Sequence, residues 1–77
     1  MSKEQLQCFL KSIGNQFSVD EILKNGLENY QSTSYKPVQK DNGLWNIVKK
    51  DNGFITCFNY SEHDVIKQMA LYRKYQR

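Results

Sequence analysis

The 77-residue sequence has no long run of apolar residues, and it is poor in the residues that build metal sites and disulfide scaffolds. The absence of a long apolar run argues against a membrane-spanning helix and a signal-peptide core, so we expect a cytoplasmic protein with no membrane partner. The two cysteines, Cys8 and Cys57, lie far apart and lack the spacing of metal ligands. We expect both to be buried as small hydrophobic residues.

Residues suited to catalysis are also scarce. His63 is the one histidine, and a metal site would need further ligands at fixed spacing. The four glycines are dispersed and form no phosphate-binding loop. Asp41 and Asp51 fall in turns at opposite ends of a predicted strand, roughly 20 Å apart, which is too far for joint acid–base catalysis. We therefore expect a protein that is not an enzyme and has no cofactor and no metal.

The most informative feature of the sequence is a short internal repeat. The tetrapeptide Lys-Asp-Asn-Gly occurs at residues 40–43 and again at residues 50–53, and each copy is followed by a short β-branched and aromatic run. Asn-Gly suits a tight type I′ turn because both central residues tolerate positive φ. The repeat therefore predicts a three-stranded antiparallel meander with strands at 35–39, 44–49 and 54–59. Pro37 makes the first of these an edge strand, since proline cannot donate a ladder hydrogen bond.

Helices are predicted on both sides of the meander by repeated N-terminal capping patterns, which begin at Ser2, Ser18 and Ser61. The first helix carries an apolar stripe and stops at Gly14. The second either ends near Gly26 or continues to about residue 31, and we favour the longer form slightly. The third carries an apolar stripe that extends to Tyr72 and, on one interpretation, to Tyr75.

The predicted fold class is thus α+β in the order ααβββα, with the last helix packed on the sheet. We expect one small domain over residues 1–77, with a helical part at 2–31, a linker at 32–34, a sheet at 35–59 and a C-terminal helix at 61–76. A chain this short needs nearly all its large apolar side chains for its core. Both faces of the predicted sheet carry apolar groups, so the face away from the last helix is either covered by the N-terminal helices or open.

An open face would mark a partner site, because exposed apolar patches usually do. We therefore predict a small protein-binding module that regulates or inhibits a larger protein, with self-association as a homodimer as another form of the same idea. The sequence leaves open whether the chain is cellular or is encoded by a phage or mobile element. The residues predicted to bind the protein partner are Tyr35, Leu44, Trp45 and Phe54.

Nucleic-acid binding is the alternative, since the formal net charge is +3 and the C-terminus holds a basic cluster. The predicted contacts are Lys36, Lys49, Lys50, Arg73, Lys74 and Arg77. The order of elements over residues 35–75, with Trp45 after Gly43, is similar to the small DNA-binding domain at the N-terminus of many tyrosine recombinases. That resemblance implies a sheet that enters the major groove. The chain departs from it by placing Asp41 and Asp51 beside its few basic residues.

Overall fold

The computed structural model describes residues 2–75 of the chain. Two helices, α1 (Lys3–Ser12) and α2 (Val19–Asn25), are followed by a short 3-10 helix, η1 (Leu27–Asn29). Three strands come next, β1 (Tyr35–Gln39), β2 (Trp45–Lys49) and β3 (Ile55–Tyr60), and helix α3 (Glu62–Tyr75) is the last element. The ααβββα arrangement predicted from the sequence is confirmed.

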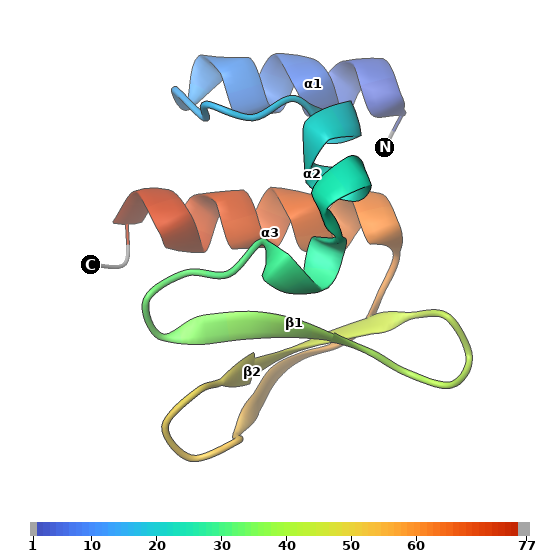
Figure 1. Cartoon of the computed structure of the whole chain (residues 1–77), viewed down its shortest axis with the longest axis vertical. Helices are drawn as coiled ribbons and strands as arrows, with labels where there is room; N and C mark the ends of the chain where they lie inside the picture. The colour runs from blue at the N-terminus through green and yellow to red at the C-terminus, as the bar shows by residue number, and fades with distance from the viewer. Residues whose placement is uncertain (1, 76–77) are drawn as a thin grey trace.

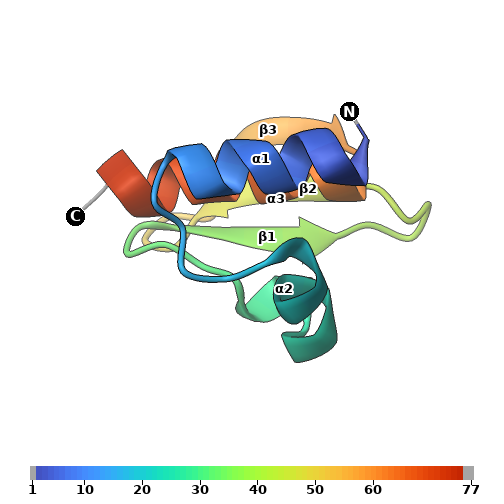
Figure 2. The same cartoon turned by 90° about the horizontal axis from the view of Figure 1, so that it is seen from above.

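The elements form layers with α3 in the middle. One face of the sheet packs on α3, and α1 packs on the side of α3 away from the sheet (Figure 1). Helix α2 and η1 run beside α3 and connect α1 to β1, as the view from above also shows (Figure 2). No helix formed by residues 2–75 lies over the opposite face of the sheet (Figure 1).

The sheet has the order β1-β2-β3 and is antiparallel throughout. The two turns lie where the Asn-Gly pairs predict, but their predicted type I′ geometry is wrong, because Gly43 and Gly53 have positive φ whereas Asn42 and Asn52 do not. The N–H of Gly43 donates to the Lys40 carbonyl, and the N–H of Gly53 donates to the Lys49 carbonyl. Strand β1 pairs with β2 in regular register, whereas the register between β2 and β3 shifts twice. Asn59 takes a left-handed φ of 57°, and its backbone N–H binds the side chain of Asn46 in place of a ladder carbonyl. These irregularities change which β3 side chains face α3.

The two N-terminal helices begin with complete capping boxes. The hydroxyl groups of Ser2 and Ser18 each accept the backbone N–H of the residue three positions later. The side chains of those later residues, Gln5 and Glu21, accept the backbone N–H of the serines in return. At Ser61 the structure shows the first of these bonds, a 3.3 Å contact from the Asp64 N–H. The three predicted helix starts are therefore confirmed to within a residue.

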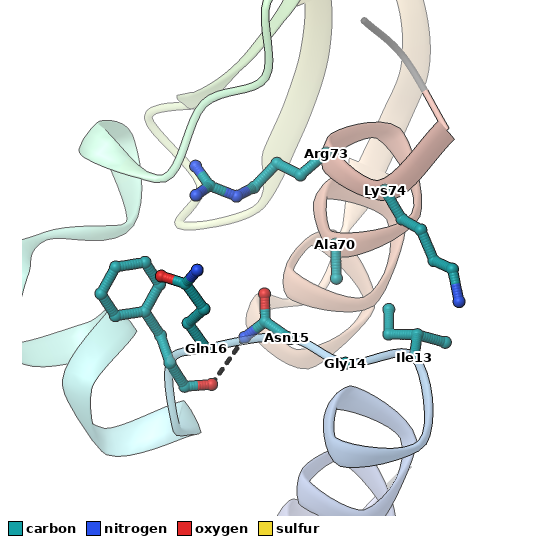
Figure 3. Close-up of a pocket in the computed structure, with 8 residues that line it drawn as sticks. Ile13, Gly14, Asn15, Gln16, Ala70, Arg73 and Lys74 are labelled. Atoms are coloured by element: carbon teal, nitrogen blue, oxygen red, sulfur yellow. Dashed lines mark hydrogen bonds between the residues drawn. The ribbon is translucent and has the colours of Figure 1, made fainter.

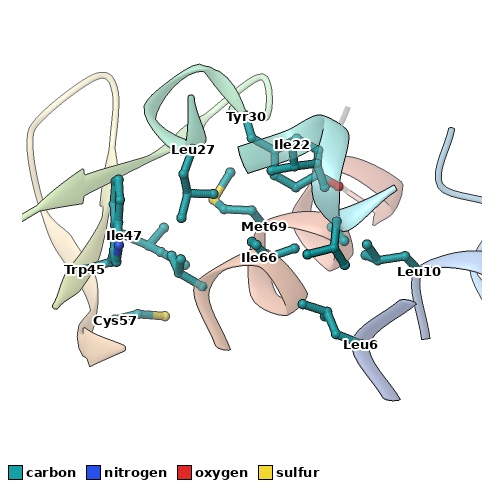
Figure 4. Packing of buried hydrophobic residues seen from close by; sticks show 13 residues of the cluster. Leu6, Leu10, Ile22, Leu27, Tyr30, Trp45, Ile47, Cys57, Ile66 and Met69 are labelled. Atoms are coloured by element: carbon teal, nitrogen blue, oxygen red, sulfur yellow. The ribbon is translucent and has the colours of Figure 1, made fainter. Parts of the chain in front are cut away.

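The core fills the space on both sides of α3 (Figure 4). From α3 it takes Val65, Ile66, Met69 and Ala70; α1 and α2 add Leu6, Leu10, Val19 and Ile22; η1 and the strands add Leu27, Tyr30, Trp45, Ile47 and Cys57. A central helix buries side chains over more of its circumference than a surface helix does. Side chains alternate along β2, and Trp45 and Ile47 face this core.

Three sequence expectations need correction. Helix α2 does not reach residue 31, because Gly26 adopts φ 95° and ψ 120°, outside any helical conformation. Cys8 is exposed on α1, so only Cys57 is a buried thiol. Tyr75 is exposed and outside the core, and the predicted end of the last helix at residue 76 lies beyond the described residues.

Candidate interaction surfaces

The uncovered face of the sheet carries Val38 and Phe58, two of the exposed large hydrophobic residues in the described part of the chain. Strand pairing sets Lys36 beside Val48, Val38 beside Asn46, and Val48 beside Ile55 on this face. The register shift adds Phe58, which follows the inward-facing Cys57 and is 61% exposed. We call these six residues, Lys36, Val38, Asn46, Val48, Ile55 and Phe58, the open sheet face. Phe54, which is 64% exposed, lies at the start of β3 beside it.

Exposure of two phenylalanines is costly in a chain this small. Both are large enough to serve the core, and the surface instead leaves most of each ring in water. Val38 is also 41% exposed, and Val48 and Ile55 between them are half-buried. The apolar side chains of the open sheet face therefore come from all three strands and form one patch rather than scattered single residues.

The four residues predicted to bind a protein partner are divided between the two sides of the sheet. Trp45 is 6% exposed and faces the core, and the ring of Tyr35 stacks on Tyr72 of α3 with centroids 4.1 Å apart. Leu44 is half-buried next to the first turn. Phe54 is the member of the set that lies on the exposed surface.

Strict alternation along the third strand predicts Ile55 and Cys57 on one face with Phe54 and Phe58 on the other. The structure breaks this pattern, because the bulge near Thr56 sends Ile55 outward while Cys57 stays inward. Val38 and Phe58 are surface residues that the prediction did not select. Alternation with the buried Pro37 and Cys57 was the available signal for both.

The predicted nucleic-acid contacts gather partly at one end of the molecule. Lys49 pairs in register with Tyr35, whose ring rests on Tyr72 near the end of α3. The β2–β3 turn with Lys50 therefore lies at the same end as the last turn of α3, as Figure 1 shows. Lys36 lies on the open sheet face, Arg73 and Lys74 lie in the last turn of α3, and Arg77 is outside the described residues.

Arg73 is tied to the rest of the fold rather than extended into solvent. Its Nη1 donates a 2.7 Å hydrogen bond to the carbonyl oxygen of Gln31. Its guanidinium lies 4.6 Å from the ring centroid of Tyr30 and 5.9 Å from that of Phe17. Lys74 is less constrained, and its ammonium lies 5.5 Å from the ring centroid of Tyr75. The side chain of Arg73 is therefore held in place by its neighbours, whereas that of Lys74 is freer.

A cavity of about 260 Å³ lies beside Arg73 (Figure 3). It is bounded by the loop at residues 13–17 on one side and by Ala70, Arg73 and Lys74 of α3 on the other. Asn15 holds this loop in place, since its amide donates to the Phe17 carbonyl at 2.6 Å and its oxygen accepts from the Tyr30 hydroxyl at 2.7 Å. Burial raises the pKa of Tyr30 to about 12, so the hydroxyl donates this bond at neutral pH.

A second group of polar atoms lies between the sheet and α3. The Cys57 thiol is 4.0 Å from the Tyr72 hydroxyl. Burial raises the pKa of Tyr72, and the hydrogen bond to Cys57 raises the pKa of Tyr60, so both phenols remain neutral. Neutral phenols beside a buried thiol offer no base that would activate it.

Three further findings concern metal binding, membrane crossing and similarity to known proteins. Within residues 2–75 no cluster of three or more histidine, cysteine, aspartate and glutamate side chains could hold a metal ion. None of the helices in that part of the chain has the length and apolar character that crossing a membrane requires. Comparison with protein-family models, with curated proteins and with solved structures found no match.

Proposed function

We propose that this protein is a small non-catalytic protein-binding module that meets its partner through the open sheet face. The observation that carries the proposal is the uncovered patch with Phe58 61% exposed and Phe54 64% exposed beside it. Apolar patches of this kind mark contact sites in proteins that are otherwise well packed. Aromatic side chains are also enriched at the energetically important centres of protein interfaces.

The chemistry of the open sheet face favours a protein over a nucleic acid. Four of its six side chains are apolar, and Lys36 is its one cation. A sheet that reads DNA needs several cations to contact phosphates and polar side chains to contact base edges. A protein surface with its own apolar centre therefore complements the open sheet face better than a nucleic acid does.

We propose further that the module regulates or inhibits a larger protein by covering a surface on it. The two cysteines are free thiols, which suits the reducing conditions of the cytoplasm.

Site-specific photo-crosslinking tests this proposal. A benzophenone amino acid is placed at position 58 of the open sheet face and, as a matched control, at position 11, where Lys11 is exposed on α1. We expect adducts in host cells that form from position 58, resist nuclease and are absent from position 11. Excess unlabelled wild-type protein should suppress them, whereas excess Phe58→Ser protein should not. Nuclease-sensitive adducts, or equal adducts from both positions, would reject the proposal.

Nucleic-acid binding is the second candidate, because Lys49, Lys50, Arg73 and Lys74 lie at one end of the molecule. This candidate predicts binding that weakens steeply between about 50 and 200 mM salt, since affinity would come from counterion release. The Lys49→Ala/Lys50→Ala double variant should then bind mixed-sequence DNA less tightly at each salt concentration. Absence of any shift in amide resonances when DNA is added at about 50 mM salt would exclude it.

A further inference from the structure

Arg73 lies at the meeting point of several hollows on the α1 side of the molecule. It borders the 260 Å³ cavity beside the loop at 13–17 and also a neighbouring hollow of about 170 Å³. The second hollow is lined in part by the apolar side chains of Phe17, Ile22 and Tyr30. We call the two together the Arg73 cleft. It lies apart from the open sheet face, which is on the far side of the sheet from α3.

The guanidinium in this cleft is pre-oriented. It is fixed from one side by the Gln31 carbonyl and from below by the ring of Tyr30, which is itself held by Asn15. A guanidinium has five N–H donors, and in the described residues one hydrogen bond from Arg73 is present. Its remaining donors are therefore available to a ligand without rearrangement of the side chain, which lowers the entropic cost of binding.

The positive charge of the larger hollow is not compensated by an acid in its lining. Neither of its two hollows has an aspartate or glutamate in its lining, whereas the larger one has both Arg73 and Lys74. The ion pair found in the described residues joins Lys3 to Asp20, which lie on α1 and α2 instead. Gln16 adds an amide at the rim of the larger hollow. The Glu28 carboxylate lies beside Gly26 at the edge of the smaller hollow. In the larger hollow, two cations and an amide donor favour an anion with more than one charge.

We propose that the Arg73 cleft binds a phosphate monoester attached to an aromatic or other apolar group. The phosphate lies in the larger hollow beside Arg73, which offers a bidentate pair of N–H groups, while Lys74 offers a second charge from the opposite side of the hollow (Figure 3). The apolar group lies in the neighbouring hollow against Phe17 and Ile22. A phosphate dianion suits two cations better than a carboxylate does, because a carboxylate carries one charge.

Titrations followed by amide chemical shifts test this assignment. The probes are inorganic phosphate, phenyl phosphate, AMP and benzoate. We expect phenyl phosphate to give saturable shifts at Gln16, Phe17 and Arg73, with an affinity above that of inorganic phosphate and of benzoate. The affinity of AMP relative to phenyl phosphate then distinguishes a nucleotide from a simpler aromatic phosphate as the source of the group.

Variants separate the site from general attraction to a basic protein. Arg73→Gln should weaken phenyl phosphate binding on the order of tenfold or more, and Lys74→Gln should weaken it several-fold. Arg73→Lys keeps the charge and the fold but loses the bidentate pair, so it should fall between wild type and Arg73→Gln. Lys40→Gln removes one charge at the far end of β1 and should bind as wild type does. Equal binding by Lys40→Gln and Arg73→Gln, shifts outside the cleft, or benzoate bound as tightly as phenyl phosphate would overturn the proposal.

Discussion

Two isoleucines in paired strands provide a direct test of the uncovered sheet face. Ile47 of β2 is 0% exposed and faces α3, whereas Ile55 of β3 is half-buried on the open sheet face. The substitutions Ile47→Ala and Ile55→Ala remove the same three carbon atoms, one set from the central strand and one from an edge strand. Strand propensity spans about 1 kcal/mol, so a larger difference between the two losses reports burial.

The expected magnitudes differ by a factor of about three. Loss of three buried carbons from Ile47 costs about 2.4 kcal/mol in transfer free energy, and the cavity raises the total to about 3–4 kcal/mol. Ile55→Ala should cost about 1 kcal/mol, because much of that side chain already contacts water. A domain of this length has roughly 4–12 kcal/mol of stability in all, so the Ile47 variant is expected to lose a large share of it.

Urea unfolding followed by Trp45 fluorescence and by circular dichroism measures both values. The tryptophan is buried near Ile47, so its emission reports the opening of this core. Equal losses for the two variants would refute the reasoning, since they would mean that the outer face is covered in solution. If stability also rose with protein concentration, the cover would be a second copy of the chain.

Three further predictions concern the helical half. Gly26→Ala should destabilise the protein by about 1–3 kcal/mol in urea unfolding, because Gly26 has φ 95° and a Cβ there would meet the Glu28 carboxylate at 2.9 Å; an unchanged midpoint would contradict this. Ser18→Ala should cost about 1 kcal/mol by the same assay, because it removes the hydroxyl that caps α2 at the Glu21 N–H; Thr33→Ala, on the exposed surface, is the control. Tyr30 has a folded-state pKa of about 12, raised above its ordinary 10.0 by burial, so its contribution to stability is full below pH 10 and is lost as pH rises toward 12. Tyr30→Phe should therefore show a smaller loss of stability across this pH interval than wild type, and identical slopes would argue against the assignment.

Local chemistry explains why the sequence predicted so much of the element order. Asn-Gly pairs restrict the backbone to a few turn conformations, and the Ser-x-x-Glu/Gln pattern satisfies helix N–H groups that would otherwise lack partners. Both signals act within four residues, so they are visible without knowledge of the fold. The positions of the turns and helix starts follow from them.

Structural features that depend on residues far apart in the sequence were harder to predict. The outward position of Ile55 comes from a bulge, and Arg73 lies against Tyr30 because α3 passes beside the segment that follows α2. A list of basic residues predicts Arg73 as a phosphate contact but gives no sign of the aromatic rings and the carbonyl that orient it. Trp45 was predicted on the partner-binding surface, whereas it is 6% exposed and belongs to the core cluster.

The central position of α3 also has a consequence for how the chain reaches its native state. Helix α1 and the sheet both pack on α3, which comes last in the order of elements. During synthesis on the ribosome, the two N-terminal helices and the strands emerge before α3, on which they pack. Their apolar faces therefore remain exposed to water until α3 has emerged. Folding is therefore expected to be a late, all-or-none event that requires residues 62–75. Nascent chains arrested before this segment should be sensitive to protease and should bind chaperones.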